Sequence, residues 1–372
     1  MRVGFFLPDL RGGGAERAAM LFARYWPSRD PQPVIVLRSA GGRYLHEASD
    51  LTVVDLGLDA VGWSATVRTP WRLAKVARAR QLDVMVTFLT VPSAVAMRLW
   101  ARNVQVVWDV QNPQWRGDRG AATWNSPARS VATRLAVRGL GAMILPSRGL
   151  ETDAGLGRFP GRVMHIPNPV DPAWLVPEHR PVEWQPRCPP FHLVAVGRLV
   201  RQKRFDLLLE ALHLLRQDAA IRLTIYGEGQ EKGALESLRE KLNLQACVTF
   251  AGFESDIRRI YEGADAFVLC SDFEGFGNVI VEALAFGLPV VATDAPFGPR
   301  DILDGGRFGV LVPPGSPGAL ADGIRSALPG GDQHDRLREL AVDRARQYSA
   351  PVVAGRLCDA LQEAQRREWR RA

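Results

Sequence analysis

Four charged residues in the C-terminal half of the chain are spaced in a way that could hold a phosphorylated ligand. Arg198 and Lys203 follow an apolar run, and Glu274 and Glu282 bracket the segment EGFGNVIVE further along the chain. Guanidinium and ammonium groups bind phosphate oxygens, as do the amides at the start of a helix. Carboxylates instead accept hydrogen bonds from hydroxyl groups. The combination predicts a site for a sugar joined to a nucleotide through a diphosphate.

The two cations are expected near the end of a buried strand. The run His192–Val196 is apolar, which places Arg198 at the carboxyl end of a sheet and Lys203 in the loop before the next helix. Arginine can bind a diphosphate as a fork and lysine as a point charge. A basic loop exposed to solvent is the alternative, because Arg201 and Arg204 lie in the same segment.

The segment that holds the two carboxylates reads as a loop followed by a helix. Gly275 and Gly277 permit close approach of the backbone to a ligand, and the helix is expected from about Asn278. The amides and dipole of a helix start favour anions. Glu282 would then lie one turn into the helix, within reach of a ribose, and Glu274 in the loop nearer the sugar. Taken singly, Glu282 could be an ordinary residue of the first helical turn and Glu274 a surface acid.

A glycine run near the N-terminus is the second candidate for a phosphate contact. Gly13 and Gly14 follow an apolar strand-like segment and precede a helical pattern over Ala15–Trp26. The run does not fit the dinucleotide pattern GxGxxG, since Arg17 occupies the position of the last glycine. A turn used only for tight packing is as consistent with these residues as a ligand loop.

The elements that must position these residues alternate between strand and helix in both halves. Continuous apolar strands separated by helical patterns are typical of a parallel sheet covered on both faces. The expected strands of the first half are Arg2–Leu7, Val34–Leu37, Leu51–Leu56, Val84–Phe88, Gln105–Val110 and Ala142–Leu145. Those of the second half are His192–Val196, Leu223–Tyr226, Cys247–Phe250, Ala266–Cys270, Pro289–Ala292 and Gly309–Val312.

A proline-rich stretch separates the two halves. Prolines are too dense over 167–186 for helix or inner strand, so a semi-rigid linker is expected there. The predicted domains are 1–186, which ends with this linker, and 187–350. Residues 351–372 are expected to form a helix that packs back on the first domain. Two doubly wound domains would place a ligand at the carboxyl ends of their strands.

Composition favours a globular protein with anionic partners. The chain has 372 residues, of which 47% are hydrophobic, and a net charge of +7. Neither a signal peptide nor a membrane-spanning run is expected, and the cysteine spacing suggests neither disulfides nor a zinc site. We therefore expect a cytoplasmic protein without a metal or other cofactor. Lysine occurs only at 75, 203, 232 and 241, so Lys203 stands out in an arginine-rich chain.

The motifs taken together resemble a known family. VGRLVRQKRFDLLLEAL, IYGEGQEKGAL, EGFGNVIVE, ALAFGLPVVATD, GPRDIL, GGGAER and IPNPV occur in the order seen in retaining glycosyltransferases of family 4, which have the GT-B fold. The resemblance covers nearly the whole chain. It implies two Rossmann-like α/β domains that face each other across a cleft, with a nucleotide-sugar donor bound mostly by the second domain. The donor-binding residues that it implies are Gly13, Gly14, Gly197, Arg198, Lys203, Gly227, Glu274, Gly275, Phe276, Gly277, Asn278, Val279 and Glu282.

The same resemblance implies an activity and its partners. Arg198, Lys203 and Glu274 would be catalytic, in the retaining transfer of a hexose or N-acetylhexosamine from a UDP-sugar or GDP-sugar. The acceptor would be a saccharide carried on polyprenyl diphosphate, in the assembly of a bacterial surface polysaccharide or glycan. The segment VVWDVQNPQW departs from the family pattern, and Asp109, Gln111 and Asn112 are its candidates for acceptor binding.

Three other functions are consistent with parts of the pattern. A nucleotide-sugar epimerase or hydrolase of the same fold would release its product without an acceptor. A non-catalytic sugar-nucleotide-binding protein should have lost one of the four charged residues, yet all four are present. A nucleic-acid-binding protein lacks support, since no aromatic and basic residues interleave. For the transferase, Lys203→Ala or Glu282→Ala should leave folding intact and severely reduce transfer.

One segment could contact a membrane. Residues 66–80 pattern as a basic amphipathic helix, with Trp71, Leu73, Val76 and Ala77 on the apolar side and arginines and Lys75 on the other. Such a helix can lie on the anionic inner face of a cell membrane. An ordinary surface helix with a solvated arginine face is an equal alternative.

Overall fold

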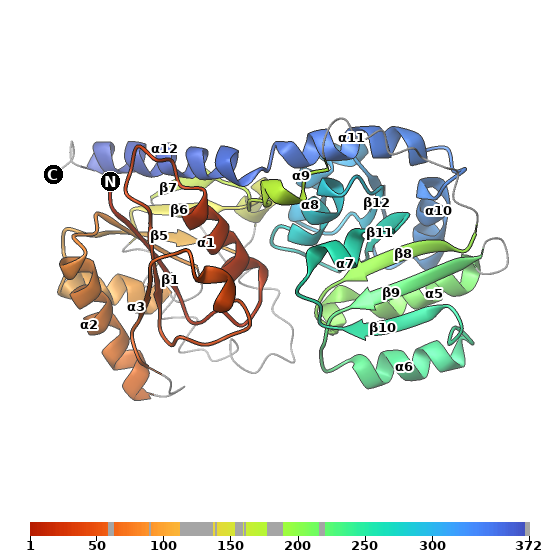
Figure 1. Cartoon of the computed structure of the whole chain (residues 1–372), viewed down its shortest axis with the longest axis horizontal. Coiled ribbons are helices and arrows are strands. Elements are labelled where there is room, and N and C mark those ends of the chain that lie inside the picture. The colour runs from red at the N-terminus through yellow and green to blue at the C-terminus, as the bar shows by residue number, and fades with distance from the viewer. Residues whose placement is uncertain are drawn as a thin grey trace. The chain divides into compact units, whose positions relative to one another are not determined.

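The computed structural model of the chain describes residues 1–58, 63–88, 91–111, 137, 140–152, 159, 161–176, 189–215 and 220–368. The chain forms two compact units, the first made of Met1–Pro169 with Ser349–Ala372 and the second of Val170–Tyr348 (Figure 1). The sequence placed the boundary later, at 186. Val170 belongs to the second unit because its N–H donates to the carbonyl of Tyr348 at 2.8 Å, and the N–H of Val176 donates to Ala285 at 3.0 Å.

The first unit is built on a seven-stranded parallel sheet with the order β3-β2-β1-β4-β5-β6-β7. All six predicted strands form. The last strand, at the edge of the sheet, was not predicted, because its sequence RVMH has only two apolar residues between Arg162 and His165. The strands are β1 (Val3–Leu7), β2 (Val34–Leu37), β3 (Val53–Asp55), β4 (Val84–Thr87), β5 (Gln105–Asp109), β6 (Ala142–Leu145) and β7 (Arg162–His165).

Helices from both ends of the chain complete the first unit. The C-terminal helix contacts the first helix of the chain, and Gln362 Nε2 donates to Asp30 Oδ2 at 2.8 Å. Arg162 of β7 forms an ion pair with Glu363 at 2.7 Å. The described helices of the unit are α1 (Gly14–Arg24), α2 (Trp63–Ala79), α3 (Val91–Ala96) and α12 (Ala350–Glu368), with short 3-10 turns η1 (His46–Ala48), η2 (Met97–Leu99) and η3 (Arg148–Thr152).

Helix α2 turns much of its predicted apolar side inward. Leu73 and Ala77 are buried in the first unit, so they are not available to lipid. Trp71 remains exposed, and the ammonium of Lys75 lies 4.6 Å from the centre of its ring. The apolar periodicity therefore marks mainly the side that packs on the core. None of the described helices is long and apolar enough to cross a membrane.

The second unit is built on a six-stranded parallel sheet with the order β10-β9-β8-β11-β12-β13. The strand order reverses between β8 and β11, and in open α/β sheets ligands bind at the carboxyl ends of the strands beside such a reversal. The predicted strands all form: β8 (Phe191–Val196), β9 (Ile221–Tyr226), β10 (Val248–Gly252), β11 (Ala266–Leu269), β12 (Val290–Thr293) and β13 (Val310–Val312).

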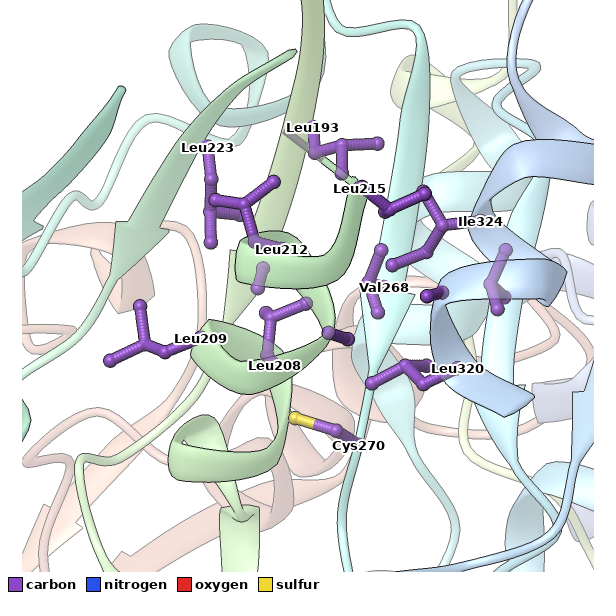
Figure 2. Packing of buried hydrophobic residues seen from close by; sticks show 14 of the residues in the cluster. Leu193, Leu208, Leu209, Leu212, Leu215, Leu223, Val268, Cys270, Leu320 and Ile324 are labelled. Carbon is purple, nitrogen blue, oxygen red and sulfur yellow. The ribbon is translucent and has the colours of Figure 1, made fainter. Parts of the chain in front are cut away.

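Helices cover both faces of this second sheet, because its side chains alternate between two cores. Leu193, Val268 and Cys270 join one core, where leucines of α5 and side chains of α10 pack on them (Figure 2). Phe267 and Leu269 join the other, with side chains of α7 and α8. The helices are α5 (Phe205–Leu215), α6 (Lys232–Lys241), α7 (Ile257–Tyr261), α8 (Asn278–Ala285), α9 (Gly298–Ile302), α10 (Pro317–Ala327) and α11 (His334–Arg346), and the 3-10 turns are η4 (Pro172–Trp174), η5 (Arg201–Lys203) and η6 (Asp304–Gly306).

Candidate active site

A largely buried ion pair lies where the strand order of the second sheet reverses. Lys203 ends η5, after β8, and Glu274 lies in the loop after β11. Lys203 Nζ donates to Glu274 Oε1 at 2.6 Å, and the two side chains are only 14% and 8% exposed. Two of the residues predicted to bind a sugar nucleotide are thus in direct contact, which the sequence did not predict. The alternative in which Glu274 is a surface acid is wrong, since the residue is buried.

A serine completes this group of residues. Ser271 Oγ donates to the same oxygen, Glu274 Oε1, at 2.5 Å, and Ser271 is fully buried. Within the described part of the chain, the other carboxylate oxygen of Glu274 accepts no hydrogen bond. We call Lys203, Ser271 and Glu274 the charged cluster. Only its place directly after a predicted strand could have drawn attention to Ser271 in the sequence.

The backbone that carries Glu274 is held tightly from one side. Glu274 pairs with Phe297 in an isolated parallel bridge, and Phe297 has a positive φ of 85°, which is rare for a bulky residue. A Cβ on Gly298 would lie 1.6 Å from the carbonyl oxygen of Phe276, so only glycine fits there. The loop before α8 and the loop before α9 therefore meet backbone to backbone.

Helix α8 begins beside the charged cluster. Gly277 is the N-cap of this helix, with a left-handed backbone (φ 102°, ψ 55°) and no side-chain cap. Glycine adopts that conformation at little cost. The first amides of a helix have no partner within it, and the dipole there favours a negative charge. The start of α8 can thus take part in binding an anionic ligand.

Glu282 is buried one turn into α8 and is held by an aromatic residue. Tyr261 OH donates to Glu282 Oε2 at 3.0 Å. The ring of Tyr261 stacks on Phe286 at 5.5 Å and meets Phe267 edge-on at 5.9 Å, both measured between ring centroids. Tyr261, which the sequence did not indicate, therefore fixes the direction of this carboxylate.

Two glycines bring the ends of β8 and β9 together. Gly227 has a φ of +139°, and a Cβ on it would lie 1.9 Å from the carbonyl oxygen of Gly197. A Cβ on Gly197 would in turn lie 3.3 Å from Lys203 Cε. Arg198 is exposed, and its side chain forms no ion pair or hydrogen bond with other described residues. The structure therefore brings Lys203 to Glu274 but shows no shared partner for Arg198 and Lys203.

A third cation of this segment, Arg204, is already paired with carboxylates. Arg204 forms ion pairs with Asp206 at 3.1 Å and with Asp272 at 3.0 Å. Hydrogen bonds to these carboxylates raise the pKa of Arg204 above its ordinary value. Arg198, whose side chain has no such partner among the described residues, is consequently better placed than Arg204 to bind an incoming anion.

The glycine run of the first unit forms the start of α1. Gly13 is the N-cap, with an extended backbone, and Gly14 is the first residue of the helix. A Cβ on Gly13 would lie 2.5 Å from the carboxylate of Glu16, a side chain that could move aside. The guanidinium of Arg17 lies 4.8 Å from the ring centre of Tyr44. These contacts are compatible with both interpretations of the run, a ligand loop and a packed turn.

Two of the predicted acceptor residues belong to a buried network of hydrogen bonds at the end of β5. Gln111 Nε2 donates to Asp109 Oδ1 at 2.7 Å and to Asn168 Oδ1 at 2.9 Å. Asn168 Nδ2 donates back to Gln111 Oε1 at 2.8 Å. We call Asp109, Gln111 and Asn168 the amide network. The third candidate, Asn112, lies outside the described residues, and Asn168 was singled out only as part of the motif IPNPV.

Burial changes the acidity of Asp109. The residue is buried, and desolvation raises the pKa of its carboxyl to about 7, although the hydrogen bond from Gln111 lowers it in part. Asp109 can therefore carry or release a proton near neutral pH. Both hydrogens of the Gln111 amide are already bonded, which leaves this side chain little capacity to donate to a ligand.

Comparison with known proteins assigns both halves of the chain. Residues 183–344 match the family model of the glycosyl transferases group 1, and residues 13–169 match that of a glycosyl transferase 4-like domain. The chain is 33% identical over 154 residues to N-acetylgalactosamine-N,N'-diacetylbacillosaminyl-diphospho-undecaprenol 4-alpha-N-acetylgalactosaminyltransferase of Campylobacter jejuni, over 41% of this chain and 40% of that one. It is 33% identical over 147 residues to the lipopolysaccharide core biosynthesis glycosyltransferase LpsE of Rhizobium meliloti, over 40% and 42%. Each match spans less than half of the relative's own length.

Solved structures resemble the whole chain. Alr3699/HepE of Anabaena, in complex with UDP and glucose, superposes with a TM-score of 0.76 over 98% of this chain and 100% of that one, at 20% identity. A glycosyltransferase from Rickettsia africae superposes with a TM-score of 0.78 over 98% of each chain, at 18% identity. These likenesses confirm the predicted fold. The chain belongs to family 4 of the glycosyltransferases and has the GT-B fold.

Proposed function

We propose that this protein transfers a sugar from a nucleoside diphosphate sugar to a hydroxyl group of an acceptor. The observation that carries the proposal is the contact between Lys203 and Glu274 at 2.6 Å. A cation suited to phosphate and a carboxylate suited to hydroxyl groups stand side by side, as the two ends of a sugar phosphate require. The pair lies beside the strand-order reversal, where ligands bind in this class of sheet.

The remaining donor contacts follow from the same arrangement. Arg198 and Lys203 bind the diphosphate together with the amides at the start of α8, and Glu282 binds the ribose. Negative charge grows on the diphosphate as the bond to the sugar breaks, so fixed cations and amides there lower the barrier. Gly13 and Gly14 are the donor contacts that we propose for the first unit. This charge compensation needs no metal ion, and undiminished transfer in EDTA is the expected result.

A UDP-sugar is the donor that we propose first, with a GDP-sugar second. Its support is the structural likeness to a protein crystallised with UDP and glucose. We propose a retaining reaction, in which the acceptor attacks on the face that the nucleotide leaves. No side chain of the charged cluster serves as a covalent nucleophile in this proposal, in which Glu274 binds a hydroxyl group of the sugar and Lys203 binds the diphosphate.

The acceptor that we propose is a saccharide carried on a lipid diphosphate. The name of the Campylobacter jejuni relative specifies a diphospho-undecaprenol acceptor. Such an acceptor would bring the protein to the inner face of the cell membrane. The exposed side chains suited to that contact are Trp71 of α2, with Lys75 beside it, and Leu99 and Trp100 at the end of η2, which contacts α2. Exposed aromatic and basic side chains favour an anionic bilayer surface.

Ligand protection followed by a transfer assay tests the proposed activity. UDP-glucose, UDP-N-acetylglucosamine and GDP-mannose are screened for a rise in the melting temperature, since a ligand that binds only the folded state stabilises it. The best donor is then incubated with and without lipid-linked saccharides. Transfer that requires the acceptor supports the proposal. Full-rate release of free sugar or of an epimer without acceptor would establish the epimerase or hydrolase instead.

Vesicle binding tests the membrane contact separately. The double variant Trp71→Ser/Lys75→Glu should bind phosphatidylglycerol vesicles several-fold more weakly than the wild type, and neither should bind phosphatidylcholine vesicles strongly. Leu214→Ser, which removes an exposed leucine of the second unit, is the matched control and should bind as the wild type does. Equal binding by all three proteins would contradict the role of α2.

A further inference from the structure

Ser271 is a fully buried residue whose hydroxyl donates a hydrogen bond to a carboxylate. Its Oγ donates to Glu274 Oε1 at 2.5 Å, within the charged cluster. A buried hydroxyl needs a hydrogen-bond partner, and a hydrogen bond to a charged group is stronger than one between neutral groups. The contact therefore indicates a task connected with Glu274.

The position of Ser271 is fixed on both sides. The preceding residue, Cys270, points into the core formed with α5 and α10 (Figure 2), and its Sγ donates to the carbonyl of Lys203 at 3.1 Å. The carbonyl of Ser271 accepts a hydrogen bond from Thr293 Oγ1 at 2.7 Å, at the end of β12. The Ser271 hydroxyl thus stands at a defined point that does not depend on the side chain of Lys203.

The two oxygens of Glu274 have different surroundings. Oε1 accepts from Ser271 and from Lys203, whereas Oε2 has no hydrogen-bond donor among the residues that the structure describes. A carboxylate oxygen has two acceptor positions, so Oε1 is close to saturated. Oε2 is the oxygen left to accept a hydroxyl group of a sugar.

Binding of the sugar nucleotide would give Lys203 a second anionic partner. Under the proposed function its ammonium is drawn to the diphosphate, and the hold of Lys203 on Glu274 weakens at the moment when the sugar must be positioned. The geometry points to Ser271 as the positioning residue that keeps Glu274 Oε2 directed at the transferred sugar while Lys203 serves the diphosphate. This inference rests on the proposed function. It adds that Ser271 and Lys203, which both donate a hydrogen bond to Oε1, have different roles once the sugar nucleotide is bound.

The experiment separates binding of the nucleotide from handling of the sugar. The probes are the nucleotide sugar that best protects the wild type, among UDP-glucose, UDP-N-acetylglucosamine and GDP-mannose, and the corresponding nucleoside diphosphate. In Ser271→Ala the nucleoside diphosphate should bind within about 2-fold of the wild type. The kcat/KM for the nucleotide sugar should fall by about 10- to 100-fold, mainly through kcat, as for a lost hydrogen bond to a charge.

Matched variants distinguish positioning from structural damage. Ser271→Thr keeps a hydroxyl and should restore most of the transfer. Cysteine is close to serine in volume but is a weak hydrogen-bond donor. Ser271→Cys should therefore keep nucleoside diphosphate binding and lose transfer, as Ser271→Ala does, and it replaces the alanine variant if that variant does not fold. Ser326→Ala removes another serine hydroxyl of the second unit, which bonds Gly323 at 2.9 Å, and should behave as the wild type does.

The outcomes separate a failure of this inference from a failure of the proposed function. Transfer at the wild-type rate in Ser271→Ala and Ser271→Cys would overturn the role of Ser271. Equal losses for the nucleoside diphosphate and its sugar would overturn it as well, because they would indicate general damage to the site. If the wild type binds no nucleotide sugar at all, the proposed function itself fails and the inference fails with it.

Discussion

The charged cluster and the amide network show two ways to keep a carboxylate inside a protein. Glu274 of the charged cluster is paired with an ammonium and a hydroxyl at 2.6 and 2.5 Å. Asp109 of the amide network has a neutral amide at 2.7 Å as its hydrogen-bond donor, and its pKa rises to about 7. A desolvated carboxylate without a cation beside it approaches neutrality. The charged cluster thus places a cation beside its carboxylate, whereas Asp109 can hold a proton near neutral pH.

The largest effect is expected from breaking the ion pair. Lys203→Ala should reduce transfer by about 100- to 1,000-fold, since it removes a cation from the diphosphate. It should also lower the free energy of unfolding by about 3–5 kcal/mol, because Glu274 remains as a buried charge without its counterion. The sequence alone predicted that this variant folds intact. The burial of the pair instead predicts a loss of stability. Urea unfolding and a transfer assay measure the two effects.

A double variant sharpens the same test. Lys203→Met with Glu274→Gln should recover most of the lost stability, since no unpaired charge remains, while transfer stays low. Equal stability of the wild type and of Lys203→Ala would show that the pair is not energetically coupled, and the contrast with Asp109 would disappear.

The amide network should instead make the stability of the protein depend on pH. The carboxyl of Asp109 titrates near 3.8 in the unfolded chain and at about 7 in the folded one, so the folded state binds the proton more tightly between these values. Stability from this group is present near pH 4 and declines as the pH rises to 7, by up to about 4 kcal/mol. Asp109→Asn should abolish that decline.

Unfolding free energies at pH 5 and pH 8 provide the measurement for Asp109. The variant Asp109→Asn should gain stability over the wild type at pH 8 and far less at pH 5, because an amide keeps the acceptor for Gln111 but carries no charge. Parallel pH profiles for the two proteins would mean that Asp109 is ionised like an exposed carboxyl.

An intermediate effect is expected at the other carboxylate of the second unit. Glu282→Ala should weaken binding of UDP or GDP by about 10- to 100-fold, because a charged acceptor for the ribose hydroxyls is lost. Isothermal titration with the free nucleotides measures it. Adenosine diphosphate serves as a comparison, since it carries the same ribose and diphosphate, and its weaker binding should fall in proportion.

The smallest effect is expected from the residue that orients Glu282. Tyr261→Phe keeps the ring that stacks on Phe286 but removes the hydrogen bond of 3.0 Å to the carboxylate. Nucleotide binding should weaken by only about 2- to 10-fold, with the melting temperature nearly unchanged. A loss as large as that of Glu282→Ala would mean that the tyrosine hydroxyl itself contacts the ligand.

The sequence predicted the framework better than the contacts within it. Apolar runs separated by helical patterns were sufficient for twelve strands of the two sheets, whereas β7, with only two apolar residues between Arg162 and His165, lacked that signal. Periodicity predicted α2 but left open whether Leu73 and Ala77 face the core or a membrane. The Lys203–Glu274 contact joins residues 71 positions apart, and the elevated pKa of Asp109 follows from burial. Such distances depend on how loops meet in space, which residue types alone do not specify.

The close approach of Gly298 to Phe276 has a mechanical consequence. Because a single methyl group on Gly298 would already lie 1.6 Å from a carbonyl oxygen, the two backbones are in direct contact. Since Glu274 also pairs with Phe297, we expect a displacement of Glu274 by an arriving sugar to move α9, whose first residue is Gly298. A reporter group attached to the exposed Arg300, after its replacement by cysteine, would sense occupancy of the sugar position from outside the site.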